Sequence, residues 1–316
     1  MYALRLLMVL GLLVAPAPRK GLTVRVVRLD VQEEVAPMAD KTRWVSTSGF
    51  FEDVSSWDNG LPVDNGDMAV FDGTSQVSLR ANSAVDSTLT RGVGEDFHLL
   101  ITPEYAGNIG QSGNPLTWPA TSTEKIICRG TGTAYLGPDG GNVVIDSTNR
   151  VNACYLSGVP DQVFVKQGRL FVTSTCGVTN GIWVDGQNAR VDMAAKNAAE
   201  LSPRILSVRN GLLVNHRAGA NPGIIFIGAG RLDQYGTLPN ATDVYVGPLG
   251  ELALLFASGE TSGCRMTVDG VLDVSLADSG VIDLASIVIG PHGHVVGNIA
   301  PSGGTYPYID LRLDEP

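Results

Sequence analysis

Beyond residue 160, the chain repeats one pattern of hydrophobic and polar positions. Each copy contains an aliphatic residue, a variable residue and a second aliphatic residue, followed within four positions by a glycine and then by another short apolar stretch. Seven copies are clear, at residues 163–165, 182–184, 206–208, 225–227, 244–246, 266–268 and 287–289. Their last residues lie 19 to 24 positions apart, and such a narrow period is typical of repeat architectures.

The alternation within each triplet predicts a short strand. Successive side chains on a strand point to opposite faces, so both aliphatic side chains point inward and the middle side chain points outward. The following glycines suit a corner, because glycine tolerates positive φ and close backbone approach. They include Gly168, Gly186, Gly211, Gly230 and Gly270. Second strands then close each coil, for example residues 170–172, 212–214 and 272–274.

Together these features predict an all-β fold, a single-chain right-handed parallel β-helix or β-solenoid with coils of roughly 20 residues. Weaker copies around residues 99–101, 126–128 and 143–145 bring the expected number of coils to about ten. A β-sandwich or jelly roll also has alternating strands, but it needs no regular spacing of matching inward triplets. We therefore favour the solenoid.

The segment from residue 44 to residue 73 is rich in aromatic residues and turn signals. Trp44 and Phe50 precede a second tryptophan, Trp57, which is followed in order by Gly, Pro, Gly-Asp, Ala and Phe71. This order resembles the segment that opens many β-helix passengers of autotransporter-like bacterial surface proteins, and also some phage virion proteins. The resemblance implies the start of a β-helix. The four aromatic side chains are expected to plug the open end of the stack, where core and strand edges are otherwise exposed.

These observations predict four parts of the chain: a leader or mis-annotated extension over residues 1–37, an N-terminal cap over 38–95, the solenoid over 96–300, and a C-terminal tail or cap over 301–316.

Residues 1–37 have two interpretations. Residues 6–14 form an apolar run behind Arg5 that resembles a secretory signal, although Pro18 fits poorly after the cleavage site and the run is short for a membrane span. Alternatively, translation begins at Met38. The codons for residues 32–35 can contain a bacterial ribosome-binding sequence at a suitable distance before the Met38 codon. We favour the second interpretation, in which the protein has no leader.

Charge and cysteine content narrow the class of protein. The chain has 32 acidic against 22 basic residues, and its formal charge of -10 disfavours binding to nucleic acid. Four cysteines without a Cys-x-x-Cys pair are too few for a disulfide scaffold or a structural zinc site. The first three, Cys128, Cys154 and Cys176, are spaced by about one coil, so we expect buried side chains stacked in neighbouring coils in preference to a disulfide.

Candidate catalytic and metal-binding residues are sparse. Asp185 and Asp269 both follow an inward valine, but they lie four coils apart, whereas carboxylate pairs in glycosidases are about 5 to 10 Å apart. The aspartates between residues 273 and 283 are typical of surface turns. His292 and His294 are spaced to share a metal, but nothing nearby completes the site. The sequence also contains no GxSxG, HExxH or phosphate-loop motif, so we expect no catalytic site, metal site or cofactor.

One feature indicates a binding surface. Four of the seven outward middle residues are aromatic, namely Phe164, Trp183, Phe226 and Tyr245, although aromatic residues make up only 6% of the chain. Such a ladder could stack on the sugar rings of a cell-surface glycan or be buried against a neighbouring subunit. The alternative is that strands favour aromatic residues and that another segment covers this face.

We therefore expect a non-enzymatic structural protein, a phage virion component such as a head decoration, fibre or tail-associated protein. It would be made in the host cytoplasm, would contact other virion proteins or itself, as in a homotrimer, and would not span a membrane. Two alternatives remain open: an exported bacterial surface adhesin, which requires a cleaved leader, and a carbohydrate-active β-helix of the tailspike or polysaccharide lyase type.

Overall fold

The structure, a computed structural model, describes much of the chain beyond residue 40. The described residues are 41–51, 53–61, 68–71, 75–78, 98–111, 115–119, 125–130, 132–147, 154–195, 203–217, 223–235, 238, 242–255, 264–276, 284–297 and 308–311. The chain divides into two units, residues 1–38 and 39–316, and every described residue belongs to the second. The two interpretations of residues 1–37 therefore lie outside the described residues.

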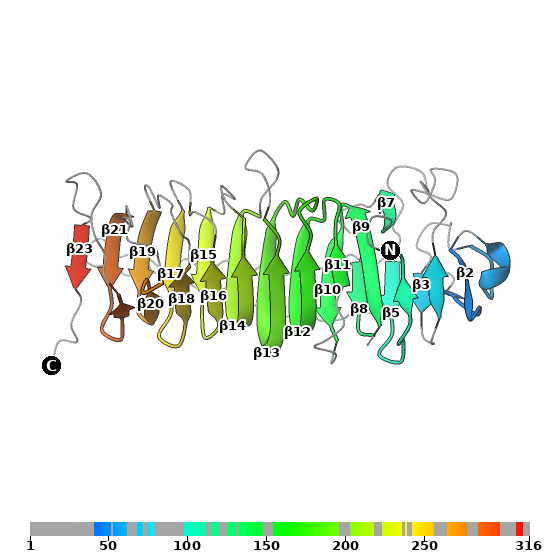
Figure 1. Cartoon of the computed structure of the whole chain (residues 1–316), viewed down its shortest axis with the longest axis horizontal. Coiled ribbons are helices and arrows are strands. Elements are labelled where there is room, and N and C mark those ends of the chain that lie inside the picture. The colour runs from blue at the N-terminus through cyan, green and yellow to red at the C-terminus, as the bar shows by residue number, and fades with distance from the viewer. Residues whose placement is uncertain are drawn as a thin grey trace, which may run out of the picture. The chain divides into compact units, whose positions relative to one another are not determined.

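Parallel strands stack side by side along the second unit (Figure 1). Thirteen of the described strands form a first ladder, in which each strand pairs in parallel with the next. They are β1 (Lys41–Arg43), β3 (Met68–Phe71), β5 (His98–Ile101), β8 (Lys125–Cys128), β10 (Asn142–Asp146), β12 (Gln162–Val172), β13 (Gly181–Met193), β14 (Ile205–Asn215), β15 (Ile224–Ile227), β17 (Asp243–Val246), β19 (Cys264–Val268), β21 (Leu284–Ile289) and β23 (Tyr308–Leu311).

A second parallel ladder closes each coil. It runs through β2 (Ser48–Phe50), β4 (Gln76–Ser78), β6 (Asn108–Ile109), β9 (Thr133–Asp139), β11 (Cys154–Leu156), the C-terminal halves of β12 to β14, β16 (Arg231–Gln234), β18 (Glu251–Leu254), β20 (Val271–Asp273) and β22 (His294–Val296). A further strand, β7 (Leu116–Pro119), pairs with the end of β9. The described part holds one short 3-10 helix, η1 (Val54–Ser56), and no helix long and apolar enough to cross a bilayer. The protein is thus an all-β parallel solenoid.

The predicted triplets pair residue by residue. Val165 lies opposite Val184, which lies opposite Val208, and the same register continues to Ile289 at the end of β21. Of the fourteen inward aliphatic side chains in the seven triplets, all but that of Ile289 are at most 2% exposed. Full burial of such a side chain stabilises the fold by about 1.5–3 kcal/mol relative to exposure, so the stack gains stability coil by coil.

Glycine is required at the corner between the two ladders. Gly211 has a φ of 95°, in the left-handed region that other residues rarely adopt. At Gly186 the reason is close approach, because a Cβ there would lie 1.6 Å from the carbonyl oxygen of Lys166. The pairing of β12 with β13, and of β13 with β14, shifts register at this corner. Both roles expected of the corner glycines are therefore found.

The expected boundaries of the solenoid, residues 96–300, stay a prediction. The first ladder also includes β1, β3 and β23, which lie outside them, and β23 carries an aliphatic triplet, Ile309-Asp310-Leu311, that the sequence prediction did not count. The expected count of about ten coils is consequently not confirmed. The right-handed sense of the coil stays a prediction.

The aromatic residues near the start of the ladder form one buried cluster, with one correction. Trp44, Trp57 and Phe71 are at most 5% exposed, and the rings of Trp44 and Trp57 meet edge to face with centroids 5.2 Å apart. Phe50, however, is 42% exposed, and its neighbour Phe51 is buried instead, 5.1 Å from Trp57 between ring centroids. The expected plugging of the stack by these rings is not confirmed and stays a prediction.

All four cysteines are buried free thiols, as expected. Cys128 ends a strand of the first ladder whereas Cys154 begins a strand of the second, so they do not form a single column. They are nevertheless neighbours: a hydrogen bond to Cys128 and burial together raise the pKa of the Cys154 thiol well above its ordinary value. Burial also raises the pKa of Cys264, to about 12.

A polar group inside the stack has no counterpart in the sequence prediction. Arg217, only 1% exposed, donates from Nη2 to the carbonyl oxygen of Thr173 at 2.9 Å and from Nε to that of Ala194 at 3.3 Å. Its backbone N–H donates to Oδ1 of Asn215, whose side-chain amide donates to Gln234 at 3.0 Å. Because Thr173, Ala194 and Arg217 follow β12, β13 and β14 in turn, the guanidinium ties three consecutive coils together.

Candidate functional surface of the solenoid

The four aromatic residues singled out from the sequence lie on one row of the first ladder. Phe164 and Trp183 are paired and their rings are stacked, with centroids 4.8 Å apart and planes 15° apart. Phe226 and Tyr245 are likewise paired opposite each other, and Ser207 separates the two pairs. All four aromatic side chains are half-buried. The structure thus brings the predicted residues together, while their binding role stays a prediction.

The indole ring of Trp183 fits because its neighbour Gly181 has no side chain. A Cβ at Gly181 would lie 2.6 Å from Cη2 of Trp183, so only glycine accommodates the ring in this position. Ser207 on the next strand is only 6% exposed. Since Phe164 and Trp183 turn their faces toward each other, these two faces are not open to a ligand.

The second ladder carries another aromatic row, which the sequence analysis missed. The rings of Tyr135, Tyr155 and Phe171 are stacked, with successive centroids 4.5 and 4.9 Å apart and planes 11° apart. The guanidinium carbon of Arg169 lies 4.1 Å from the centroid of the Phe171 ring, a cation–π contact. On the next strand, Asp192 takes the position of Phe171, so the aromatic row continues as a charged one.

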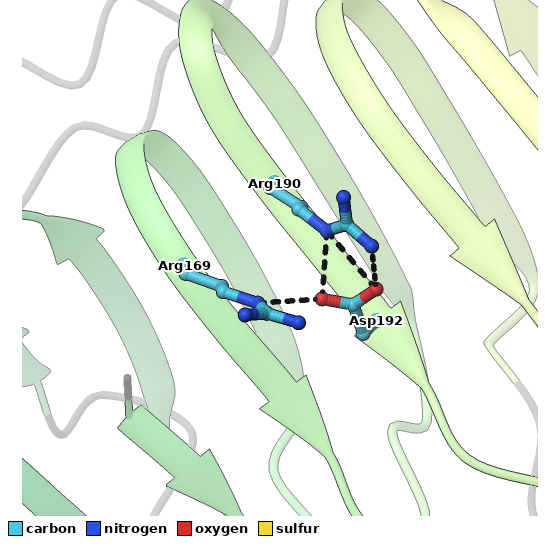
Figure 2. A network of polar contacts seen from close by, with 3 residues as sticks. All are labelled: Arg169, Arg190 and Asp192. Atoms are coloured by element: carbon cyan, nitrogen blue, oxygen red, sulfur yellow. Dashed lines mark hydrogen bonds and ion pairs between the residues drawn. The ribbon is translucent and has the colours of Figure 1, made fainter. Parts of the chain in front are cut away.

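The charged row begins with two arginines that share one carboxylate (Figure 2). Arg169 donates from Nε to Oδ2 of Asp192 at 2.9 Å across the strand pair, and Arg190 donates from Nη2 to Oδ1 at 2.7 Å within the same strand. Burial alone raises the pKa of Asp192, but the hydrogen bonds from Arg190 and Arg169 outweigh it and bring that pKa below its ordinary value. The carboxylate is therefore ionised and fully engaged at neutral pH.

The converse arrangement lies two strands further along, where one arginine binds two carboxylates. Arg231 donates from Nε to Asp233 at 2.6 Å and from Nη1 to Glu251 at 2.5 Å. By register, Asp233 follows Asp192 after one intervening strand, so the two carboxylates are separated by about 10 Å along the stack. This spacing matches that of some catalytic carboxylate pairs. Both groups are ion-paired, however, and Asp192, whose pKa is lowered, is a poor general acid.

An open surface cavity of about 450 Å³ lies beside this row. It covers the corner between the two ladders. Its lining comprises Gly168, Arg169, Gln187, Asn188, Ala189, Arg190, Asn210, Gly211, Leu212, Ala229, Gly230, Arg231, Leu249 and Glu251. The lining therefore includes three arginines and three residues with side-chain amides, a composition suited to binding an anionic or hydroxylated ligand.

The aspartates considered in the sequence analysis lie elsewhere and are bound to neighbours. Asp185 accepts a hydrogen bond from Arg209 at 2.9 Å, and Asp269 accepts one from the backbone N–H of His292 at 3.1 Å. Ser275 donates to Asp273 from its hydroxyl and its backbone N–H, and both bonds lower the pKa of that carboxyl. The other two aspartates of this group, Asp278 and Asp283, lie outside the described residues.

The two histidines considered, and disfavoured, as metal ligands in the sequence lie beside β21 and β22. Nδ1 of His292 lies 3.3 Å from Asp269, and His294 is an exposed residue at the start of β22. Within the described ranges, no group of three or more His, Cys, Asp or Glu side chains is placed to hold a metal ion.

Comparison with models of known families, with curated proteins and with solved structures yields no match.

Proposed function

We propose that this chain is a non-enzymatic structural protein that acts through its surface. The observation that supports this most directly is that the paired carboxylates beside the cavity, on Asp192 and Asp233, are each bound to arginine. A hydrolase or lyase of the solenoid type needs at least one acid or base free to exchange a proton with substrate. The ion-paired row instead resembles a network that holds adjacent coils together.

We further propose a virion component, with contacts to other virion proteins or to further copies of itself. The support is the resemblance of residues 44–73 to the opening segment of phage and surface β-helix proteins, together with the long stack of uniform coils. The exported adhesin is the second candidate, because the same resemblance covers autotransporter-like passengers and the aromatic row of the first ladder offers apolar surface.

Two measurements test these proposals. The full-length chain is incubated with a panel of neutral and acidic polysaccharides, and new reducing ends and unsaturated sugar products are measured against heat-denatured protein. Product formed only by the native chain contradicts the non-enzymatic proposal. Mass spectrometry of purified particles and of the cell envelope from the source then locates the protein. Recovery in particles, starting near Ala39, supports the virion component, whereas a processed chain in the envelope supports the adhesin.

A further inference from the structure

The cavity beside the charged row contains guanidinium N–H groups that no other described residue uses. Arg169 bonds to Asp192 through Nε alone, so both of its Nη atoms remain available. Arg190 uses Nε and Nη2, and Arg231 uses Nε and Nη1, which leaves one Nη atom on each. Figure 2 shows the remaining nitrogen of Arg190 directed away from Asp192.

These arginines are held in place before any ligand arrives. The guanidinium of Arg169 lies against the ring of Phe171 and is bonded to Asp192, while Arg190 donates to the same carboxylate from both Nε and Nη2. A side chain fixed in this way loses little conformational entropy when its free N–H groups bind a ligand. The ion pairs thus position the donors as well as stabilising the stack.

The rest of the lining adds neutral donors and apolar surface. Gln187, Asn188 and Asn210 also line the cavity, and the carbonyl of the Asn210 amide already accepts the backbone N–H of Gly211. Leu212 and Leu249 add aliphatic surface, and Leu249 is 79% exposed. Amides suit hydroxyl groups, and aliphatic side chains suit the C–H faces of sugar rings, so the lining as a whole matches a saccharide.

Charge decides what kind of saccharide fits. The three arginines around the cavity are balanced by Asp192, Asp233 and Glu251, so the site lacks the excess positive charge that binds a phosphate backbone. A guanidinium edge pairs in a bidentate manner with a carboxylate as well as with a phosphate, so the preference for carboxylates on a sugar chain rests on the amides and aliphatic side chains of the lining and on the spacing of the arginines.

The spacing of the arginines along the stack suits a ligand with several carboxylates. Arg169 lies opposite Arg190 on the adjacent strand, about 5 Å away along the stack, and Arg231 lies two strands beyond, at about 10 Å.

We propose that this cavity binds a carboxylated saccharide, a short chain of sugar acids. Its carboxylates bind the free N–H groups of Arg169, Arg190 and Arg231, and its hydroxyls bind the amides of the corner. The site lies at the corner between the ladders and the adjoining start of the second ladder, and none of the four aromatic residues of the first ladder lines it. This inference goes beyond the proposed structural function, which requires no small ligand.

Isothermal titration of the full-length chain with a trimer of galacturonate tests the proposal. The neutral galactose trimer serves as the matched ligand and inorganic phosphate as the third probe. We expect the acidic trimer to bind and the Arg190→Gln and Arg169→Gln variants to bind it at least about tenfold more weakly. Arg265→Gln serves as the control, because it removes the same charge from an ion pair with Asp243 that does not line the cavity. Its affinity should match the wild type.

Two cavity variants keep the test decisive if one fails to fold, since Asp192 retains one arginine in each; circular dichroism and the thermal midpoint verify the fold. No binding of the acidic trimer, equal binding of the neutral trimer, stronger binding of phosphate, or an equal loss in Arg265→Gln would each overturn the inference. Cleavage of the trimer would instead contradict the proposed non-enzymatic function, so the two failures are distinguishable.

Discussion

Phe164 and Trp183 stack face to face on neighbouring strands, with ring centroids 4.8 Å apart. Removing the indole should therefore weaken the coil pair β12–β13. We expect Trp183→Ala to lower the free energy of unfolding by about 1–3 kcal/mol, from lost apolar contact and lost stacking. Trp183→Phe keeps a ring in the row and should lose less. The midpoint of urea unfolding, followed by circular dichroism, measures both, and equal losses would show that the stack contributes nothing.

The ion pairs of Asp192 predict a pH dependence. Its pKa is lower in the folded protein than the ordinary value near 4, so the stabilisation is present above about pH 4 and is lost as the pH falls further. Asp192→Asn should lose about 1–3 kcal/mol at pH 7, as for a charged hydrogen bond. The stability difference between wild type and variant should shrink toward pH 3. A difference that stays constant over this range would mean that the carboxylate charge is not involved.

The thiols should be inert until the protein unfolds. All four are buried, and the raised pKa values of Cys154 and Cys264 further suppress the reactive thiolate. We expect no reaction with Ellman's reagent at pH 8 in the native state and four equivalents in guanidinium chloride. Reaction of the native protein, or fewer than four equivalents after unfolding without reductant, would contradict the arrangement of free buried thiols.

Arg217 should be essential for stability. Arg217→Met leaves the carbonyl groups of Thr173 and Ala194 without the guanidinium that bonds them, and we expect a loss of about 2–4 kcal/mol. Arg265→Met, at an exposed arginine, is the matched control and should lose far less. Thermal midpoints of the two variants provide the comparison. Similar midpoints would show that the buried guanidinium is not needed.

The inward faces of the coils were predictable because burial and strand geometry impose the same two-residue period. Val163, Ile182 and Leu206 pair in sequence order, although the spacing between copies varies, because each copy carries its own inward pair. The number of coils was harder to predict from the sequence. Strand β1, with the sequence Lys-Thr-Arg, follows the same pairing without a triplet, whereas β23 carries one, Ile309-Asp310-Leu311, that the sequence prediction did not count.

The sequence predicted burial of Phe50, but Phe51 is buried instead, so the prediction failed by a single residue. Two adjacent phenylalanines satisfy either phase of a strand, and a shift of one residue moves each side chain to the opposite face. Nothing in the sequence distinguishes the two phases. The burial of Arg217 could not be predicted for another reason. It depends on hydrogen bonds to carbonyl groups of two preceding coils, and no sequence motif indicates these contacts.

The charged row, by contrast, could have been predicted from a sequence pattern. The sequence repeats Arg-Val-Asp at residues 190–192 and Arg-Leu-Asp at 231–233, each with an aliphatic residue between opposite charges. On a strand this places both charges on the outer face. The row was not predicted because only the outward positions of the first ladder were considered as a binding surface. Its contact with Arg169 depends on the pairing register and needed the structure.

Equivalent positions on successive coils have a genetic consequence. Ile205, Ile224 and Asp243 are consecutive partners in the first ladder, and the last two are 19 residues apart. Deleting residues 224–242 would join the chain at an equivalent point and place Val208 opposite Val246, again aliphatic against aliphatic. Unequal recombination within the gene can thus shorten or lengthen the protein by whole coils while conserving its interior, so that length evolves independently of sequence.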